Sequence, residues 1–266
     1  MKGMKATVYS LEGKEVKEIT LPLQFEEEYR EDLIRRAVLS EESKEKQPKS
    51  NYRFAGMETS AKYRGRKEDY GSLKNKGQAM LPREVIPNGG MGRVKRIPSA
   101  VKGRRAHPPK VEKKIIERMN NKEYKKALRS ALRGSTIQEV VEKRIGVKGM
   151  KLPIIVEDSF EKVSKIKDVI ALLEKLKLNG IIEQAKERVR RKTGLRCKRT
   201  KLIKRAPKYL LFVCKDGKIK DAAENLSGVD AQTVSNLRVK DLSPGAIGGR
   251  ITIFTEAAIK EISEKL

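Results

Sequence analysis

The chain has 266 residues, of which 38% are hydrophobic, so most of it can bury a core rather than remain disordered. No run approaches the roughly 18 apolar residues of a membrane span, and the two cysteines, Cys197 and Cys214, indicate no disulfide framework. The formal net charge of +27 lies mainly in two blocks: residues 48–110 have 16 Lys/Arg against 4 Asp/Glu, and residues 186–208 have 12 against 1. Because a merely solvated surface would interleave both signs, these blocks indicate a nearly neutral folded body with two segments that bind a polyanion.

Apolar periodicity predicts helices and strands along the rest of the chain. In chain order, these are a strand at 6–9, a helix at 25–43, a helix at 111–133 that Asn120-Asn121 divides, a helix at 136–145, a strand at 153–156, helices at 163–175 and 181–191, a strand at 209–214, a helix at 221–226, strands at 231–235 and 251–254, and a helix at 256–265. Thr136 and Glu139 have the spacing of a capping box. Near-continuous apolar strands that alternate with helices are typical of a parallel sheet covered on both faces. The sequence therefore predicts one α/β domain over residues 1–266, with a three-layer body, a mostly parallel sheet and a long extended basic loop inserted after the first helix.

The loop at 48–110 is too long for an ordinary connection, since structureless loops beyond about 12–15 residues are usually functional or disordered. It holds six of the ten prolines and eight of the twenty glycines. Its cations alternate with flat side chains, as in Tyr52-Arg53-Phe54 and Lys62-Tyr63-Arg64. Guanidinium groups pair with phosphates, and aromatic rings stack on unpaired bases. We therefore expect this loop, together with a second basic segment at 186–208, to bind RNA.

The candidate RNA-binding residues are the cations of both segments and the single histidine. They are Arg53, Lys62, Arg64, Arg66, Lys67, Lys74, Lys76, Arg83, Arg93, Lys95, Arg96, Lys102, Arg104, Arg105, His107, Arg190, Arg191, Lys192, Arg196, Lys198, Arg199, Lys204 and Arg205.

Catalytic motifs are absent from the sequence. It contains no phosphate-binding GxxxxGK[ST] loop, and Gly89-Gly90-Met91-Gly92 lies within the loop rather than between a strand and a helix. His107 has no second histidine or suitably spaced cysteine with which to bind a metal, and Glu157-Asp158 is better explained as an acidic cap at a helix N-terminus. We therefore expect no enzymatic activity, cofactor or metal. Two alternatives stay open: an RNA-modifying enzyme with a doubly wound body and basic RNA-binding arms, and a DNA-packing protein.

Several local motifs resemble one protein family. The most specific is Gly92–Lys110, with the core Val101-Lys102-Gly103-Arg104-Arg105-Ala106-His107-Pro108-Pro109. Supporting matches are YREDLIRRA at 29–37, ALRSA at 127–131, LSPG at 242–245 and FTEAA at 254–258. Over essentially its whole length the chain resembles large-subunit ribosomal protein four, a universal family, in its archaeal and eukaryotic branch.

This resemblance implies a cytoplasmic, structural constituent of the large ribosomal subunit. Its partners would be large-subunit rRNA, neighbouring large-subunit ribosomal proteins and the nascent polypeptide, with no membrane and no small-molecule substrate. The loop at 48–110 would penetrate the rRNA and reach the peptide exit tunnel. Its tip would lie at about 71–83, with the tunnel-facing residues Gly71, Ser72, Leu73, Lys74, Asn75, Lys76 and Gly77.

Overall fold

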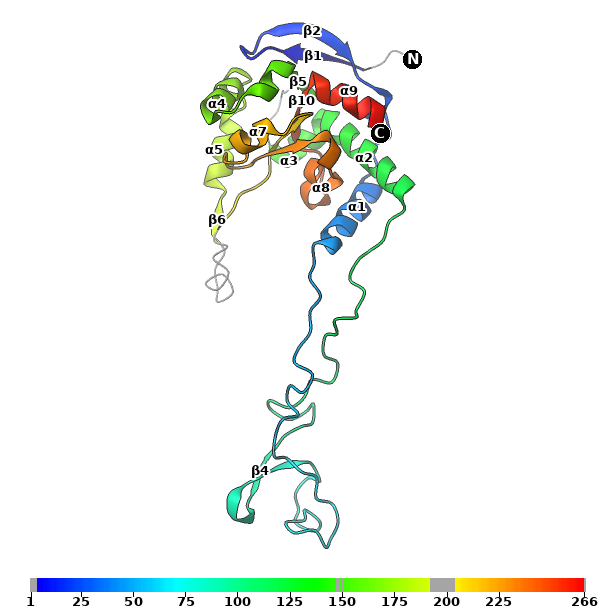
Figure 1. The fold of residues 1–266 in the computed structure, drawn as a ribbon, viewed down its shortest axis with the longest axis vertical. Helices are drawn as coiled ribbons and strands as arrows, with labels where there is room; N and C mark the ends of the chain where they lie inside the picture. The colour runs from blue at the N-terminus through cyan, green and yellow to red at the C-terminus, as the bar shows by residue number, and fades with distance from the viewer. Residues whose placement is uncertain (1–3, 147–148, 150, 192–203, 266) are drawn as a thin grey trace. The chain divides into compact units, whose positions relative to one another are not determined.

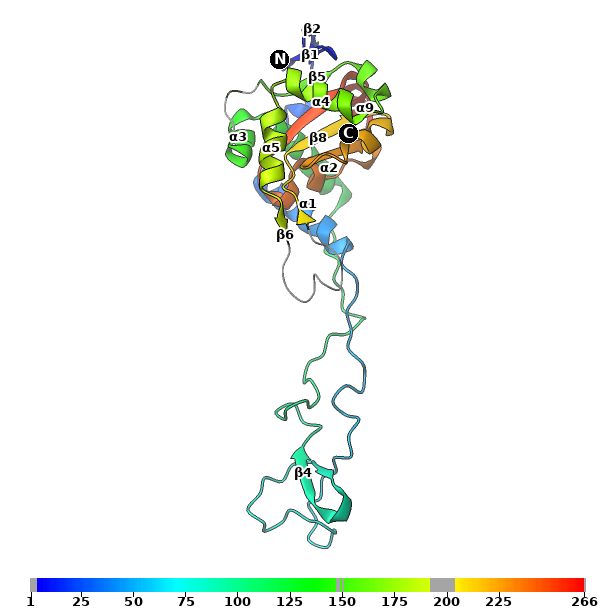
Figure 2. The ribbon, with the colours of Figure 1, turned by 90° about the vertical axis from the view of Figure 1, so that its left-hand side faces the viewer.

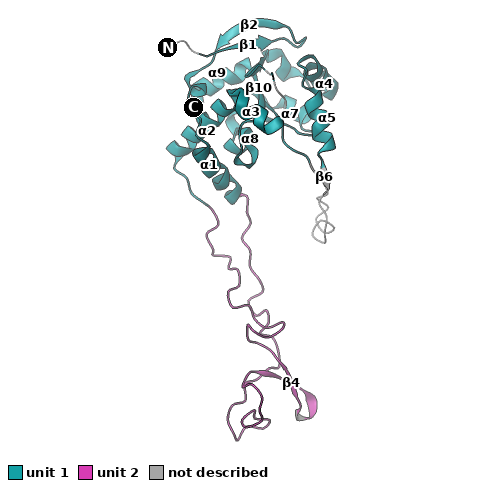
Figure 3. Ribbon diagram, turned by 180° about the vertical axis from the view of Figure 1, so that it is seen from behind, with its two compact units in different colours: residues 1–44, 117–266 teal, residues 45–116 magenta. Residues whose placement is uncertain are grey.

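The computed structural model describes residues 4–146, 149, 151–191 and 204–265 (Figure 1). The chain divides into two compact units (Figure 3). One unit, which we call the body, comprises residues 1–44 and 117–266, and the other, which we call the insert, comprises residues 45–116.

A six-stranded sheet forms the centre of the body, in the order β2-β1-β5-β10-β8-β9. Its strands are β1 (Lys5–Tyr9), β2 (Glu15–Thr20), β5 (Ile154–Val156), β8 (Leu210–Cys214), β9 (Val229–Thr233) and β10 (Ile251–Thr255). β2 pairs antiparallel with β1, whereas β1–β5, β5–β10, β10–β8 and β8–β9 are parallel pairs. The prediction of a mostly parallel sheet is therefore confirmed.

Helices cover both faces of this sheet (Figure 2). The helices are α1 (Glu31–Lys44), α2 (Asn121–Thr136), α3 (Gln138–Ile145), α4 (Ile166–Lys175), α5 (Asn179–Glu187), α7 (Lys218–Ala223), α8 (Val239–Leu242) and α9 (Glu256–Lys265). Short 3-10 turns are η1 (Leu23–Phe25), η3 (Asp158–Lys162), η4 (Val234–Asn236) and η5 (Pro244–Ala246).

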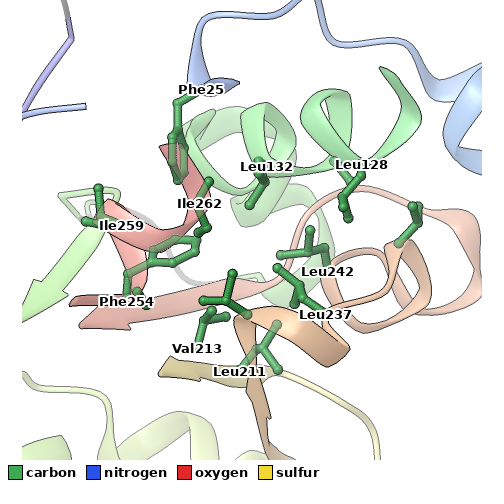
Figure 4. Close-up of a cluster of buried hydrophobic side chains, with 14 of the residues drawn as sticks. Phe25, Leu128, Leu132, Leu211, Val213, Leu237, Leu242, Phe254, Ile259 and Ile262 are labelled. Atoms are coloured by element: carbon green, nitrogen blue, oxygen red, sulfur yellow. The ribbon is translucent and has the colours of Figure 1, made fainter. Parts of the chain in front are cut away.

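Alternate residues of the central strands enter two separate buried clusters, which is the expected consequence of the two-residue strand period. In β8, Leu211 and Val213 belong to a cluster with side chains of α1, α2, α8 and α9 (Figure 4). Within it, the rings of Phe25 and Phe254 meet edge to face with centroids 5.4 Å apart. The neighbouring Phe212 belongs to the second cluster, which α3, α4, α5 and α7 supply. The body thus has the three layers that the sequence predicts.

The helix predicted at 25–43 begins only at Glu31, and the helix predicted at 221–226 lies at Lys218–Ala223. Three other sequence predictions about the body's elements are wrong. The helix predicted at 111–133 begins only at Asn121, because the backbone before it is bound by α1: Ser40 Oγ donates to the Glu117 carbonyl at 2.6 Å, and the Glu117 N–H donates to Ser43 Oγ at 2.9 Å. The capping box does not form, since Thr136 ends α2 and its hydroxyl donates to the Arg133 carbonyl.

The third error concerns the helix predicted at 181–191. It runs from Asn179 to Glu187, and a short strand, β6 (Arg190–Arg191), follows. The edge strand β2 was not predicted at all. Its residues are exposed except for the half-buried Ile19, so it lacks the apolar alternation that marks a strand in sequence.

A buried arginine joins several segments of the body by hydrogen bonds and ion pairs. The Arg250 side chain is fully buried, and it donates to Asp230 Oδ2 at 2.7 Å, to the Asp241 carbonyl at 3.2 Å and to the Leu210 carbonyl. Lys208 lies 2.9 Å from the same Asp230 carboxylate. These bonds hold the segments around β8, β9 and β10 in register.

Candidate nucleic-acid interface

The insert consists of two chain limbs that lead to a more compact end, where β4 is labelled (Figures 1 and 2). The limbs touch at Gly56 and Gly103. A Cβ on Gly56, whose φ is +78°, would lie 2.5 Å from the Gly103 carbonyl carbon, so only a residue without a side chain fits there. This contact, and not a hydrophobic core, sets how closely the two limbs approach.

A small antiparallel ladder organises the compact end. β3 (Arg83–Val85) pairs with β4 (Met91–Val94), with the 3-10 turn η2 (Pro87–Gly89) between them. Lys62 adds an isolated bridge to Arg83, in which the Lys62 N–H donates to the Arg83 carbonyl at 3.0 Å and the reverse bond measures 3.2 Å. Ala61 and Leu73 are the buried apolar side chains of this part. The loop that the sequence predicts as extended therefore contains local ordered structure.

Most of the candidate RNA-binding side chains of the insert are exposed. Twelve of the fifteen are exposed: Arg53, Lys62, Arg66, Lys67, Lys74, Lys76, Arg93, Arg96, Lys102, Arg104, Arg105 and His107. The other three are half-buried and donate to backbone carbonyls: Arg64 to Tyr70 at 2.8 Å, Lys95 to Val101 at 3.4 Å and Arg83 to Ala79 at 3.5 Å. These three cations therefore also contribute to the local structure of the insert.

Ion pairing differs between the two units. Lysines and arginines of the body pair with carboxylates at many places, for example Lys17 with Glu256 and Arg36 with Glu123, both at 2.8 Å or less. Within the described residues 46–116, no basic side chain lies within ion-pair distance of an acidic one. Among the described residues, the positive charge of 46–116 is thus not compensated by ion pairs.

The residues of the predicted tip fall into two groups. Ser72 and Leu73 are buried within the insert, with 8% and 3% of their surfaces exposed, and Gly71 is half-buried. Lys74, Asn75, Lys76 and Gly77 are exposed, and positive φ angles of 60° at Asn75 and 65° at Gly77 turn the chain there. Of the seven residues predicted to face the tunnel, 74–77 are therefore the exposed ones, and the exposed stretch continues through 78–80.

Aromatic side chains accompany the cations on the insert. Tyr52 and Phe54 pack edge to face with ring centroids 5.8 Å apart, and the Arg53 guanidinium carbon lies 5.9 Å from the Phe54 centroid. The Tyr52 hydroxyl donates to Glu58, and this hydrogen bond raises the pKa of the tyrosine. Tyr63 and Tyr70 are exposed, at 59% and 78%. Exposed rings beside guanidinium groups are suited to stacking on unpaired bases.

The second basic segment begins at the end of α5 and contains two short paired strands. β6 and β7 (Lys204–Arg205) form a two-stranded antiparallel ladder, in which Arg190 is opposite Arg205 and Arg191 is opposite Lys204. Of the remaining candidates, Lys192, Arg196, Lys198 and Arg199 lie outside the described residues.

Comparison with known proteins gives a consistent result. The model of the ribosomal protein L4/L1 family matches residues 19–265. The chain is 43% identical over 263 residues to large ribosomal subunit protein uL4 of Methanocaldococcus jannaschii, covering 98% of this chain and 99% of that protein. It is also 42% identical over 261 residues to the uL4 protein of Methanoculleus marisnigri and 37% identical over 264 residues to that of Haloquadratum walsbyi, with 98% of this chain covered in both.

The chain belongs to the ribosomal protein L4/L1 family. The resemblance inferred from Gly92–Lys110 and the shorter motifs is thereby confirmed, including its archaeal branch, since these relatives are archaeal.

In this member of the L4/L1 family, the acidic groups at the carboxyl edge of the sheet bind the chain's own backbone. Asp158 Oδ1 accepts the Ala257 N–H at 2.7 Å, so this carboxylate lies at the N-terminus of α9, whereas the turn η3 that follows Glu157 has no side-chain cap. The buried Glu161 accepts the Lys215 N–H at 2.8 Å, the Asp216 N–H at 3.2 Å and the Thr255 hydroxyl. This is the edge of the sheet at which an α/β enzyme would bind a nucleotide. Here the Glu161 carboxylate instead accepts hydrogen bonds from the segment that follows β8 and from the end of β10.

The described residues of this family member contain no group of three or more His, Cys, Asp or Glu side chains that could hold a metal ion. None of their helices combines the length and the apolar character needed to cross a membrane.

Proposed function

We propose that this protein is a structural constituent of the large ribosomal subunit that binds large-subunit rRNA through the insert. The observation that carries the proposal is the set of twelve exposed basic or imidazole side chains on the insert, which pair with no described carboxylate. Phosphate groups would supply the missing negative charge, and the exposed rings of Tyr52, Phe54, Tyr63 and Tyr70 would stack on unpaired bases. Family membership supports the ribosomal role.

The second basic segment, 186–208, would form a further rRNA contact beside the body. Neighbouring large-subunit proteins would be its other partners, and assembly into that subunit would place the protein in the cytoplasm. The exposed residues 74–77 would be the part of the insert that meets the nascent polypeptide in the exit tunnel, because they lie at a chain reversal and carry no buried side chain.

Charge removal on the insert tests rRNA binding. Changing Arg93, Arg96, Arg104 and Arg105 to Gln removes four exposed cations. Binding to a large-subunit rRNA fragment, measured by filter retention over a salt series, should weaken strongly, and the slope of log Kobs against log salt should fall by about 3 to 4. Chemical footprinting of the same rRNA should show protection that the variant loses.

The matched control removes four exposed lysines of the body by the substitutions K162Q, K165Q, K167Q and K218Q. Both variants have the same net charge, so a non-specific effect of charge would weaken them equally. Equal weakening, or full affinity of the insert variant, would contradict the proposal.

A further inference from the structure

A small pocket in the compact end of the insert gathers positive charge from two chain segments, residues 62–64 and Arg83. Lys62, Arg64 and Arg83 line it, together with the single carboxylate Glu84 and the backbone of Gly71. The lining side chains therefore carry a net charge of +2 near neutral pH. The pocket has a volume of about 20 Å³, which is room for about one oxygen atom. We propose that it receives an oxygen of one RNA phosphate group whose remainder lies outside the pocket, a proposal that rests on the rRNA-binding function above.

The pocket is preorganised by the backbone. Arg64 is fixed by its bond from Nη1 to the Tyr70 carbonyl at 2.8 Å, and the Leu73 N–H donates to the Arg64 carbonyl at 3.2 Å. Gly71 has a φ of +72°, and a Cβ there would lie 2.5 Å from Arg64 Nη1. A glycine at this position leaves the space that the guanidinium group occupies.

Two of the cations are forced into proximity. Lys62 and Arg83 are directly opposite each other in an antiparallel bridge, with both backbone hydrogen bonds formed. Opposite residues of such a pair have their Cβ atoms about 4.5–5.5 Å apart, and like charges there destabilise the pairing. No described carboxylate lies within ion-pair distance of either residue. An anion between them would convert this repulsion into attraction.

Arg83 also has an unused donor. Its Nε is shielded from solvent and has no hydrogen-bond partner among the described residues. A buried donor without a partner costs free energy, and a guanidinium group is suited to phosphate oxygens because its N–H groups form a planar fork. The Arg83 side chain is only half-buried, so a phosphate oxygen would meet the part of the guanidinium group that stays open, and a small movement of the side chain would also give Nε a partner.

A double-mutant cycle tests whether Lys62 and Arg83 hold the same phosphate. The test cycle consists of K62Q, R83Q and the double variant K62Q/R83Q. The control cycle consists of R83Q, R93Q and the double variant R83Q/R93Q, since Arg93 is an exposed cation of the neighbouring strand outside the pocket lining. Each dissociation constant for the rRNA fragment is measured by filter retention. R83Q should weaken binding by about tenfold or more, because a hydrogen bond to a charged group is lost.

The decisive result is the coupling. The effects of K62Q and R83Q on the dissociation constant should be strongly non-additive, since the second substitution removes a contact to a phosphate that the first has already released. The effects of R83Q and R93Q on the dissociation constant should be additive within about twofold. R83K, which retains the charge but loses the fork, should recover only part of the affinity. Additivity of K62Q with R83Q would overturn the pocket while leaving rRNA binding by the insert intact.

Two further measurements separate the remaining outcomes. If neither the unmodified protein nor any variant bound the rRNA fragment, the proposed function itself would fail. The second measurement is a calorimetric titration of the protein with inorganic phosphate. If R83Q abolishes phosphate binding while K62Q and R83Q have additive effects on rRNA binding, the pocket binds free phosphate and the RNA ligand is refuted. Limited proteolysis of the free R83Q protein should match that of the unmodified protein, which shows that the insert has not lost its structure.

Discussion

Excising the insert should leave the body folded and somewhat more stable. The two ends to be joined are already held together, because Ser40 and Ser43 of α1 form hydrogen bonds of 2.6 and 2.9 Å with the backbone of Glu117. Both buried hydrophobic clusters of the body are built from described residues outside 45–116. A variant that connects Lys44 to Glu117 through a short Gly/Ser linker therefore removes no core side chain.

The loop-closure entropy gives the size of the effect. The insert, residues 45–116, spans 72 residues, and a linker of about six shortens the loop about twelvefold. Since the closure cost grows as (3/2)RT ln n, the free energy of unfolding should increase by at most about 2 kcal/mol. The gain will be smaller to the extent that the internal hydrogen bonds of the insert already restrict its ends.

Urea denaturation followed by far-ultraviolet circular dichroism measures this change. A matched control replaces the insert by a Gly/Ser chain of equal length, which keeps the loop length and should leave the free energy of unfolding near its original value. Loss of the cooperative transition in both variants, or a decrease of more than about 2 kcal/mol, would refute the independence of the body from the insert.

The buried groups of the body give three further predictions. R250A should lower the free energy of unfolding by about 3–5 kcal/mol, since it removes a fully buried side chain with its hydrogen bonds and leaves the half-buried Asp230 carboxylate with only Lys208 nearby. A loss below about 1 kcal/mol would contradict this. Burial alone would raise the pKa of Asp230, but the charges of Arg250 and Lys208 lower it below its ordinary value. The ionised carboxylate therefore stabilises the fold above a pH of about 4, and this stabilisation is lost as the pH falls through the folded-state pKa. Urea midpoints measured across this acid range should show that D230N lacks this dependence. Burial raises the pKa of Cys214 to about 12. In a C197S variant, where Cys214 is the remaining thiol, iodoacetamide should therefore label the protein at about pH 8 only after unfolding in urea. Rapid labelling of the folded protein would contradict the burial of Cys214.

The parts of the fold that could be predicted were those whose signal is local. The central strands were placed within two residues, because Ile154, Leu211 and Ile253 lie in short apolar runs bounded by polar residues. The inner face of α2 was likewise correct at Ala127, Leu128, Ala131 and Leu132, which are all buried. In each case, the burial that shapes the element is visible in a few consecutive residues.

The errors arose where residues distant in the sequence determine the local backbone structure. Residues 111–120 have a helical apolar spacing, but the serines of α1, more than 70 positions away, bind the backbone at Glu117 and keep it out of a helix. The bridge between Lys62 and Arg83 is similarly non-local, and it joins two residues whose charges repel. No periodicity marks such a contact, so the phosphate pocket was not predicted, although Lys62, Arg64 and Arg83 were each candidate RNA-binding residues.

The separation of charge between the two units has a physical consequence for assembly. In the body, carboxylates compensate buried or half-buried cations, as Asp230 does for Arg250, so the fold does not require a polyanion. In the insert, by contrast, the backbone pairing sets like charges opposite each other, since Lys62 is opposite Arg83. Such a pair weakens the pairing in isolation and strengthens it when an anion lies between the two charges. If an RNA phosphate is that anion, binding should stabilise the local structure of the insert, and the Lys62–Arg83 bridge should resist hydrogen exchange more strongly in the rRNA complex than in the free protein.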